Sequence, residues 1–386
     1  MHIKYLYIDD EQFDAIHPLV NEIEHFATGN MSIEHIRVCS MKDVTKKFID
    51  ESFDGLIIDQ KLDAANDHGE TVDYWGTALA QNLRTEMIGR GIPTSPIILM
   101  SNEDVFVDYY DADESAHNLF DFTVKKGRVA EDVNYACKVS KIIYDLAEAY
   151  KIAREQVLPI IDTADYKIYD LLNPLLQWDQ SIFQYTDKRF IDCAISKSKD
   201  IHALISLILN NLVRSAGILV SEDMLATKLG IDINASADWN NLLEHFNQCR
   251  YQGIFSKLKP RWWMSKVEDL WYERCTLNQS LRAFTAQERV EELKSIFALE
   301  QLVAITPKYT KGIQSERFWV NCVVTGTPLD PADALVANKS DIKSWEQPLY
   351  LDPETVINRD HLPKYPVHPD YQSKVKVLFK RLSNNG

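Results

Sequence analysis

Four short apolar runs, each followed by a polar residue, constrain the fold of this 386-residue chain more than any other feature. Runs of this length and composition are typical of buried strands in a parallel sheet. The carboxyl ends of such strands meet at one edge, where open α/β sheets bind their ligands. In chain order the four runs end at Asp9–Asp10, Asp59, Ser101 and Lys125. We therefore expect these side chains to form one site at that edge.

Helical patterns separate these runs, and the alternation predicts a flavodoxin-like five-stranded parallel sheet. The expected strands are 3–9, 33–39, 53–59, 96–101 and 120–125, and the expected helices are 11–26, 41–50, 76–90 and 104–116. A long helix should follow from about 130 to 156, because apolar residues recur there at helical spacing. Pro159 is expected to end it.

The remainder of the chain predicts a mostly α-helical region of unfamiliar type with a loop-rich end. A buried helix is expected from Ile201, a strand at 316–324 and a last helix at 371–382. The predicted organisation is an α/β domain at 1–130, a connecting helix at 131–158 and a helical domain at 159–386. Frequent prolines indicate an extended arm within the last of these, at 328–370.

The residues at the expected edge suit phosphoryl chemistry. Mg²⁺ prefers oxygen ligands, usually one or two carboxylates together with phosphate oxygens. Asp9, Asp10 and Asp59 would supply such ligands, Lys125 would pair with a phosphate oxygen, and Ser101 would donate a hydrogen bond to another. Phosphoryl transfer depends mainly on positioning and on neutralising charge, so these few groups suffice.

Taken together, these fragments resemble the receiver domain of two-component response regulators over about the first 130 to 150 residues. The resemblance implies Mg²⁺ as the cofactor and a histidine kinase as the phosphoryl donor. It implies the following roles: Asp59 is the phosphoacceptor, Asp9 and Asp10 are metal-binding acids, Ser101 is the switch hydroxyl, Phe122 is the switch aromatic three positions before the lysine, and Lys125 is that lysine.

The chain departs from the receiver pattern at three places. Lys126 stands where a proline usually follows the lysine, and Asn102 stands where a small residue is usual. The stretch between Asp59 and the helix at 76–90 is longer than usual and contains four further acids, Asp63, Asp67, Glu70 and Asp73. No chemical group is lost, so phosphorylation is still expected, but the usual switching motion is in doubt.

Lys61 and Glu103 support a separate hypothesis about how long the phosphoryl group persists. In receivers these positions, two after the acceptor and two after the switch hydroxyl, flank the path of the hydrolytic water. A bridge between their opposite charges would cover the phosphate and slow its loss. The alternative is two exposed side chains whose pairing contributes only ~0–1 kcal/mol.

Composition excludes several other classes of protein. The chain lacks an apolar run long enough to cross a membrane, and its six cysteines are scattered without metal-binding or disulfide spacing. We expect a cytoplasmic protein with reduced thiols. No nucleotide-binding, hydrolase or metalloprotease motif appears, so no independent catalytic activity is expected.

Charge and motifs argue against nucleic acid as the main partner. Residues 1–128 contain 24 acidic and 11 basic residues, a balance of −13, and the remaining residues are nearly neutral. Residues 221–231 resemble the start of a helix-turn-helix, but 232–248 contain no Lys or Arg to contact DNA. Residues 250–274 interleave basic residues with three tryptophans, a pattern that fits nucleotide stacking, a protein interface or plain core.

Three outputs remain open from the sequence. The first is a protein–protein output through the helical C-terminal domain, with an effector, another receiver or a homodimer as partner. The second is a phosphate sink, a buffer in a phosphorelay without switch output. In overall layout this alternative loosely resembles the buffering component of three-component kinase-based phage-defence systems. The third, a DNA-binding transcription regulator, is the least favoured.

Overall fold

The computed structural model describes residues 2–63, 72–89, 92–105, 118–161, 163, 166–275, 278–309 and 314–383. The chain forms two compact units. The first unit contains Met1–Gln177 together with Ala194–Ile208 and Gly253–Leu258. The second contains Trp178–Cys193, Leu209–Gln252 and Lys259–Gly386.

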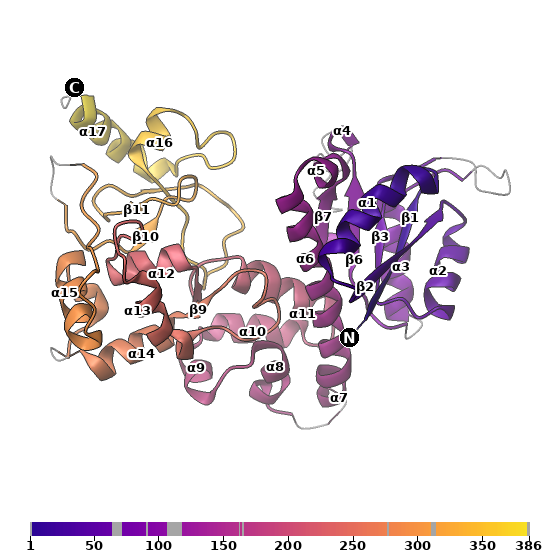
Figure 1. The fold of residues 1–386 in the computed structure, drawn as a ribbon, viewed down its shortest axis with the longest axis horizontal. Helices are drawn as coiled ribbons and strands as arrows, with labels where there is room; N and C mark the ends of the chain where they lie inside the picture. The colour runs from indigo at the N-terminus through magenta and orange to yellow at the C-terminus, as the bar shows by residue number, and fades with distance from the viewer. Residues whose placement is uncertain are drawn as a thin grey trace. The chain divides into compact units, whose positions relative to one another are not determined.

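A five-stranded sheet forms the centre of the first unit (Figure 1). Its strand order is β2-β1-β3-β6-β7, and every neighbouring pair is parallel. The strands are β1 (Ile3–Asp9), β2 (Met31–Arg37), β3 (Gly55–Ile58), β6 (Ile97–Ser101) and β7 (Phe122–Lys125). This is the 2-1-3-4-5 order of flavodoxin-like folds, so the predicted fold class is confirmed.

Helices cover both faces of this sheet. Apolar side chains of α2 (Met41–Asp50) and α3 (Gly76–Gly89) pack against alternate residues of the central strands, including Leu56 and Leu99. On the opposite face, α1 (Phe13–Phe26) packs against α6 (Val133–Ile152), and the Tyr5 hydroxyl of β1 donates to the Ile143 carbonyl of α6 at 2.8 Å. The period-two alternation of buried strand residues thus gives each face its own helical layer.

Two elements of the first unit differ from the expected pattern. Of the helix expected at 104–116, the described part is α4 (Glu103–Val105), and residues 106–117 lie outside the described residues. The long stretch after Asp59 forms an antiparallel pair, β4 (Lys61–Leu62) with β5 (Tyr74–Trp75). Residues 64–71, which include Asp67 and Glu70, also lie outside the described residues.

The expected helix at 130–156 is interrupted at its start and longer at its end. A short helix, α5 (Lys126–Glu131), ends at Asp132, whose side chain accepts from the backbone N–H groups of Asn134 and Tyr135 and so begins α6. The helical path then continues through a π-helical segment, Ala153–Val157, into α7 (Leu158–Ile161). The expectation that Pro159 ends the helix was wrong, because the helical path runs past it to Ile161.

A buried polar network lies at the amino end of β7. Asp121 accepts hydrogen bonds from Arg84 at 2.8 Å and from the Tyr150 hydroxyl at 2.5 Å, and the backbone N–H of Ile97 donates to it at 2.9 Å. The ring of His202, on α11 (Ile201–Ile208), lies 3.1 Å from Asp121 Oδ1, the oxygen that also accepts from Tyr150. Burial alone would raise the pKa of Asp121, but the charges of Arg84 and His202 hold it well below its usual range.

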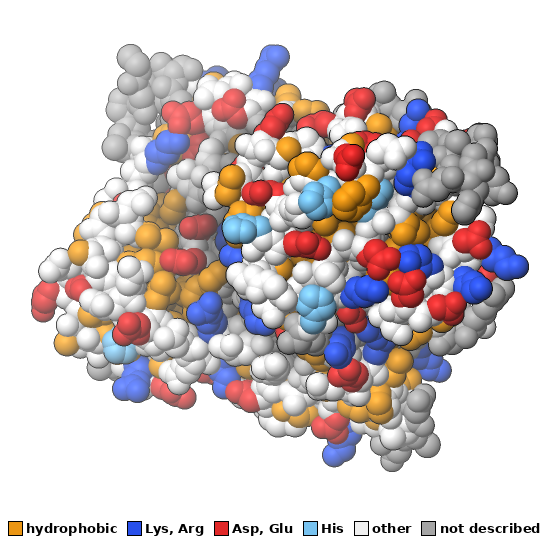
Figure 2. Space-filling view, turned by 45° about the vertical axis from the view of Figure 1, so that its right-hand side comes forward, with side chains coloured by type: hydrophobic (Ala, Val, Ile, Leu, Met, Phe, Trp, Pro, Cys, Tyr) orange, Lys and Arg blue, Asp and Glu red, His pale blue; other side chains and the backbone are white. Residues whose placement is uncertain are grey.

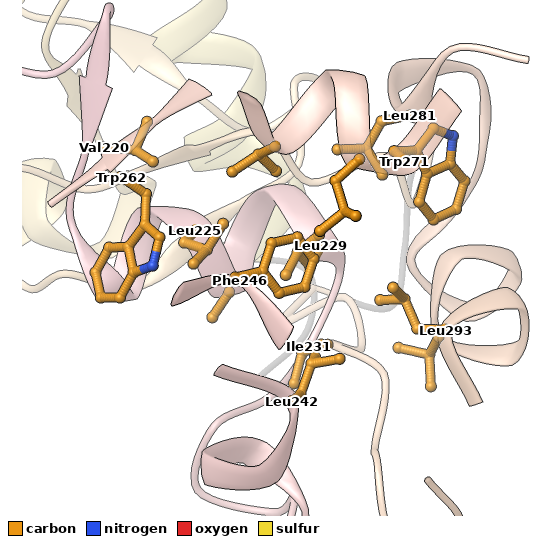
Figure 3. Close-up of a cluster of buried hydrophobic side chains, with 14 of the residues drawn as sticks. Val220, Leu225, Leu229, Ile231, Leu242, Phe246, Trp262, Trp271, Leu281 and Leu293 are labelled. Atoms are coloured by element: carbon orange, nitrogen blue, oxygen red, sulfur yellow. The ribbon is translucent and has the colours of Figure 1, made fainter. Parts of the chain in front are cut away.

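The second unit is mostly helical, as expected, and has a large apolar core (Figure 3). Its longer elements include α12 (Glu222–Leu229), α13 (Trp239–His245), α14 (Met264–Arg274) and α15 (Ala286–Phe297), and β8 (Leu219–Val220) pairs with β9 (Trp262–Trp263). The boundary between the units falls within α10 (Lys188–Lys197). Trp262, Trp263 and Trp271 are at most 3% exposed. Of the three interpretations of residues 250–274, the tryptophans therefore fit core.

The segment that resembles a helix-turn-helix is packed into this core. Met224–Leu229 of α12 are all buried, and Gly230 takes a left-handed backbone conformation, with φ of 80°, to end the helix. The guanidinium of Arg289, on α15, is fully buried and donates to the carbonyls of Lys228 and Phe318. The bond to Lys228 satisfies a backbone carbonyl in the last turn of α12 and holds this helix against α15.

The loop-rich end contains short paired strands. β10 (Val320–Asn321) pairs with β11 (Pro328–Leu329), and β12 (Leu335–Val336) pairs with β13 (Tyr350–Leu351), all antiparallel. The strand expected at 316–324 is therefore reduced to two residues. The proline-rich segment also forms α16 (Pro353–Ile357), and with α17 (Gln372–Ser383) it buries a small core of its own, which includes Leu335, Leu351 and Leu378. Within the described ranges, no helix is both long enough and apolar enough to cross a membrane.

Candidate functional site

Three aspartates lie at the carboxyl edge of the sheet, where the sequence placed them. Asp9 is the last residue of β1, Asp10 follows it, and Asp59 follows β3, the strand that pairs with β1. Asp9 is fully buried, and its carboxylate accepts from the Tyr7 hydroxyl at 2.5 Å and from the Glu11 backbone N–H at 3.0 Å. Asp59 is 4% exposed and accepts from the backbone N–H of Lys61 at 2.8 Å.

The lysine that faces these acids is Lys126 rather than the expected Lys125. The Nζ atom of Lys126 lies 2.6 Å from Asp9 Oδ2, 2.9 Å from Asp59 Oδ1 and 3.3 Å from Glu11 Oε1. The Nζ atom of Lys125 pairs instead with Glu103. Lys125 is the last residue of β7, whereas Lys126 begins α5, and this change from strand to helix directs the buried side chain of Lys126 to the acids.

This correction also changes two neighbouring assignments. The residue after Lys126 is Gly127, so Lys126 no longer stands in the place of the usual proline. The position three before Lys126 is Thr123, so Phe122 does not hold the place of the switch aromatic. Phe122 is half-buried at the start of β7, opposite Ile98 of β6.

Ser101 lies at the same edge as the acids. It is the last residue of β6, is 1% exposed, and is paired in register with Lys125 of β7. The sheet therefore brings its hydroxyl to the end of the strand next to β3. This placement matches the expected one, and the role of the hydroxyl remains a prediction.

The edge carries more negative charge than Lys126 neutralises. Burial and the nearby charges of Asp9 and Asp59 raise the pKa of Asp10 to about 6. Burial also raises the pKa of Asp59, although the charge of Lys126 opposes this shift. Burial by itself would lower the pKa of Lys126, but the two carboxylates that it contacts raise it well above its usual value. A further cation would therefore be stabilised at this edge.

The carboxylate oxygens suit a hard divalent cation, which needs only one or two protein carboxylates when a phosphate supplies further oxygens. Among the side chains that the structure describes, no group of three or more His, Cys, Asp or Glu residues is placed to hold a metal ion. A cation at these acids would therefore need further ligands, such as phosphate oxygens.

Lys61 and Glu103 do not form the expected bridge in the described part of the chain. The Nζ atom of Lys61 lies 3.0 Å from Asp63 Oδ2, and Glu103 pairs with Lys125. The physical reason is proximity: each of these two side chains lies closer to another residue of opposite charge than to its expected partner. The backbone of Lys61, rather than its side chain, contacts the acceptor.

Gly76 fixes the backbone immediately after the acceptor. Its N–H donates to the Gln60 carbonyl at 2.8 Å, and a Cβ atom added at Gly76 would lie 2.2 Å from the Asp59 carbonyl oxygen. A side chain there would displace the acceptor, because a backbone atom cannot rotate away as a flexible side chain can.

We therefore expect Gly76→Ala to lower the free energy of unfolding by about 1–3 kcal/mol, the usual cost of overpacking. Gly89→Ala is the matched control, since Gly89 ends the same helix and an added Cβ would meet nothing within 4 Å. Urea denaturation of both variants measures the difference. Equal stability of the two variants would show that a Cβ atom at Gly76 can be accommodated beside the Asp59 carbonyl without a loss of stability.

Sequence reasoning missed three residues of this site. Lys126 was not predicted as the site lysine because two adjacent lysines follow the same apolar run and Lys125 is the first of them. Tyr7 and Glu11 were not singled out, although Tyr7 is two residues before Asp9 in β1 and so shares its face of the sheet. That period-two relation was the available signal for Tyr7. No comparable signal was available for Glu11.

The surface gives little support for a nucleic-acid interface. On the face drawn in Figure 2, the described basic side chains are mixed with acidic ones and form no continuous basic stripe. A basic stripe is the usual electrostatic footprint of nucleic-acid binding.

Comparisons with known proteins add little to these observations. No family model matches the chain, and no curated protein shows significant similarity to it. Among solved structures, the chain is similar to the crystal structure of a response regulator receiver domain protein from Clostridium thermocellum, with 14% identity and a TM-score of 0.22. The match covers 36% of this chain and 98% of that one. By its strand order and the residues at its edge, the N-terminal region has a receiver-like fold.

Proposed function

We propose that this protein accepts a phosphoryl group on Asp59 from a phosphohistidine of a histidine kinase. The observation that carries this proposal is the position of Lys126, whose ammonium group lies between Asp59 and Asp9. In the reaction, a carboxylate oxygen of Asp59 would form a bond to phosphorus as the bond from phosphorus to the histidine nitrogen breaks. Lys126 would then stabilise the charge of the transferred group.

Mg²⁺ would be held by Asp9, Asp10 and Asp59. When bound, the metal ion would neutralise charge on the phosphoryl oxygens. Burial, together with the charges of Asp9 and Asp59, raises the pKa of Asp10 to about 6, and this supports the assignment because a bound cation would stabilise the ionised carboxylate. The protein's own contribution is to orient Asp59 through the backbone N–H of Lys61 and to bury it from water.

The output would be a protein–protein contact made by the helical second unit. The phosphate sink is supported by the overall layout, by the lack of a DNA-binding output and by a possible bridge between Lys61 and Glu103, but each of these two residues has another charged partner. We therefore favour a switch whose state changes its contacts with an effector, a second receiver or another copy of the chain.

The test is incubation with acetyl phosphate and Mg²⁺, followed by intact-mass measurement. The wild-type protein should gain the mass of one phosphoryl group, and Asp59→Asn should not. Asp63→Asn is the matched control, because Asp63 is an exposed acid close to the acceptor in sequence and should leave phosphorylation unchanged. Phosphorylation that persists in Asp59→Asn would refute the assignment of the acceptor.

Light scattering on the same samples tests the output. A change of oligomeric state or of hydrodynamic size on phosphorylation would support the switch. Long-lived phosphorylation that leaves both unchanged would instead favour the sink.

A further inference from the structure

The second unit contains a cavity that has no part in the phosphoryl chemistry at Asp59. Its volume is about 560 Å³, within the range of about 300–1,000 Å³ that is usual for small-molecule sites. Its lining comes from the π-helical end at Asn210 and Asn211, the start of α12, residues 259 and 261, and parts of the loop-rich end between 321 and 365. Two tyrosines, Tyr350 and Tyr365, are among these lining residues.

Two basic residues of this cavity have unused hydrogen-bond donors. Arg261 donates from Nε to the Val213 carbonyl at 2.7 Å, which fixes its guanidinium. Its terminal nitrogens, and the ammonium of Lys259, make no hydrogen bond or ion pair with the described residues. A third basic residue, Arg214, donates to Asn210 at 3.0 Å. Burial lowers the pKa values of Arg214 and Arg261, so an anion beside them would be stabilised.

The acids of the cavity do not cancel this charge. Asp341 lies 3.7 Å from Lys339, so these two offset one another. Glu346 accepts from the Asn211 side chain at 2.8 Å and from the Lys343 backbone N–H at 3.0 Å. The charge of Asp223 partly offsets the effect of burial on Arg261. Over the whole lining, four basic residues (Arg214, Lys259, Arg261 and Lys339) outnumber three acids (Asp223, Asp341 and Glu346) by one.

We propose that this cavity binds a small phosphorylated molecule of about nucleotide size, with Lys259 and Arg261 contacting its phosphate. A guanidinium held by one nitrogen presents its remaining donors in a planar fork, which matches phosphate oxygens, and a nearby ammonium adds a point charge. The segment 250–274 therefore contributes to ligand binding through its cations. Its tryptophans lie in the core and offer no stacking surface.

The test is calorimetric titration of the full chain with pyrophosphate and with ATP, in the presence of a chelator so that no Mg²⁺ is available at Asp59. The double variant Lys259→Gln/Arg261→Gln should bind about tenfold more weakly or worse, because it loses charge-assisted hydrogen bonds. The matched control is Arg250→Gln/Arg274→Gln, which removes two exposed charges outside the cavity from the same segment. The control should bind as the wild type does.

Two further variants keep the result interpretable. Lys259→Gln alone changes an exposed side chain, so its fold should persist while its binding weakens. Asp59→Asn should bind both probes normally, which separates this site from the receiver edge. Failure of both probes to bind, or equal weakening in the cavity variant and the control, would overturn the proposal.

Discussion

Lys126→Met should lower the free energy of unfolding by about 3–5 kcal/mol near neutral pH, the usual cost of leaving buried charges unpaired. Its ammonium is 8% exposed and is the cation shared by Asp9 and Asp59, which are buried more deeply still. Lys125→Met is the matched control. Lys125 is 38% exposed and pairs with the more exposed Glu103, so its loss should cost at most about 1 kcal/mol.

Urea denaturation in the presence of a chelator measures both variants without interference from metal ions. Lowering the pH should shrink the deficit of Lys126→Met, because the unpaired carboxyl groups then take up protons. Phosphorylation by acetyl phosphate provides a second readout, and it should be impaired in Lys126→Met and retained in Lys125→Met. If Lys125→Met were the more damaging substitution by both measures, the original sequence assignment would be right.

Asp121→Ala should also cost about 3–5 kcal/mol, because it leaves the guanidinium of Arg84 buried without its carboxylate. The Tyr150 hydroxyl and the Ile97 backbone N–H would lose their acceptor as well. Asp14→Ala is the control, since Asp14 is exposed on α1 and its substitution should change stability by less than about 0.5 kcal/mol.

The stabilisation that Asp121 contributes to the folded state should decrease as the pH is lowered. Its pKa in the folded protein is held well below its usual value, so the folded state binds its proton less readily than the unfolded chain does. The stabilisation is therefore fully present above the unfolded pKa, near ~4, and is lost as the pH falls toward the folded pKa. Denaturation curves measured between neutral and acidic pH should converge for wild type and Asp121→Ala. A constant gap across that range would contradict this account.

Much of the first unit could be predicted from sequence, because its signals are local. β1 begins and ends where expected, β6 and β7 end where expected but begin one and two residues later, and β3 begins two residues later and ends one residue earlier. Asp9, Asp10, Asp59 and Ser101 follow from the rule that parallel strands end at a common edge. Each of these assignments needs only the apolar run that precedes the residue.

The errors arose where a neighbouring turn or a distant segment decides the outcome. Whether Lys125 or Lys126 faces the acids depends on where β7 gives way to α5, and boundaries of elements are the least certain part of a sequence prediction. The partners of Lys61 and Glu103 depend on side chains that periodicity does not place. In the second unit, Arg289 and the cavity around Arg261 depend on contacts between segments far apart in the chain.

The first unit is built from segments that are synthesised at different times. All five strands of the sheet are complete by Lys125, but Tyr150 and His202, which close the network around Asp121, emerge from the ribosome later. The last segment of this unit, Gly253–Leu258, emerges later still. The nascent sheet therefore lacks some of the contacts of its unit until well over a hundred further residues have been synthesised. A fragment that ends at residue 130 would never form these contacts.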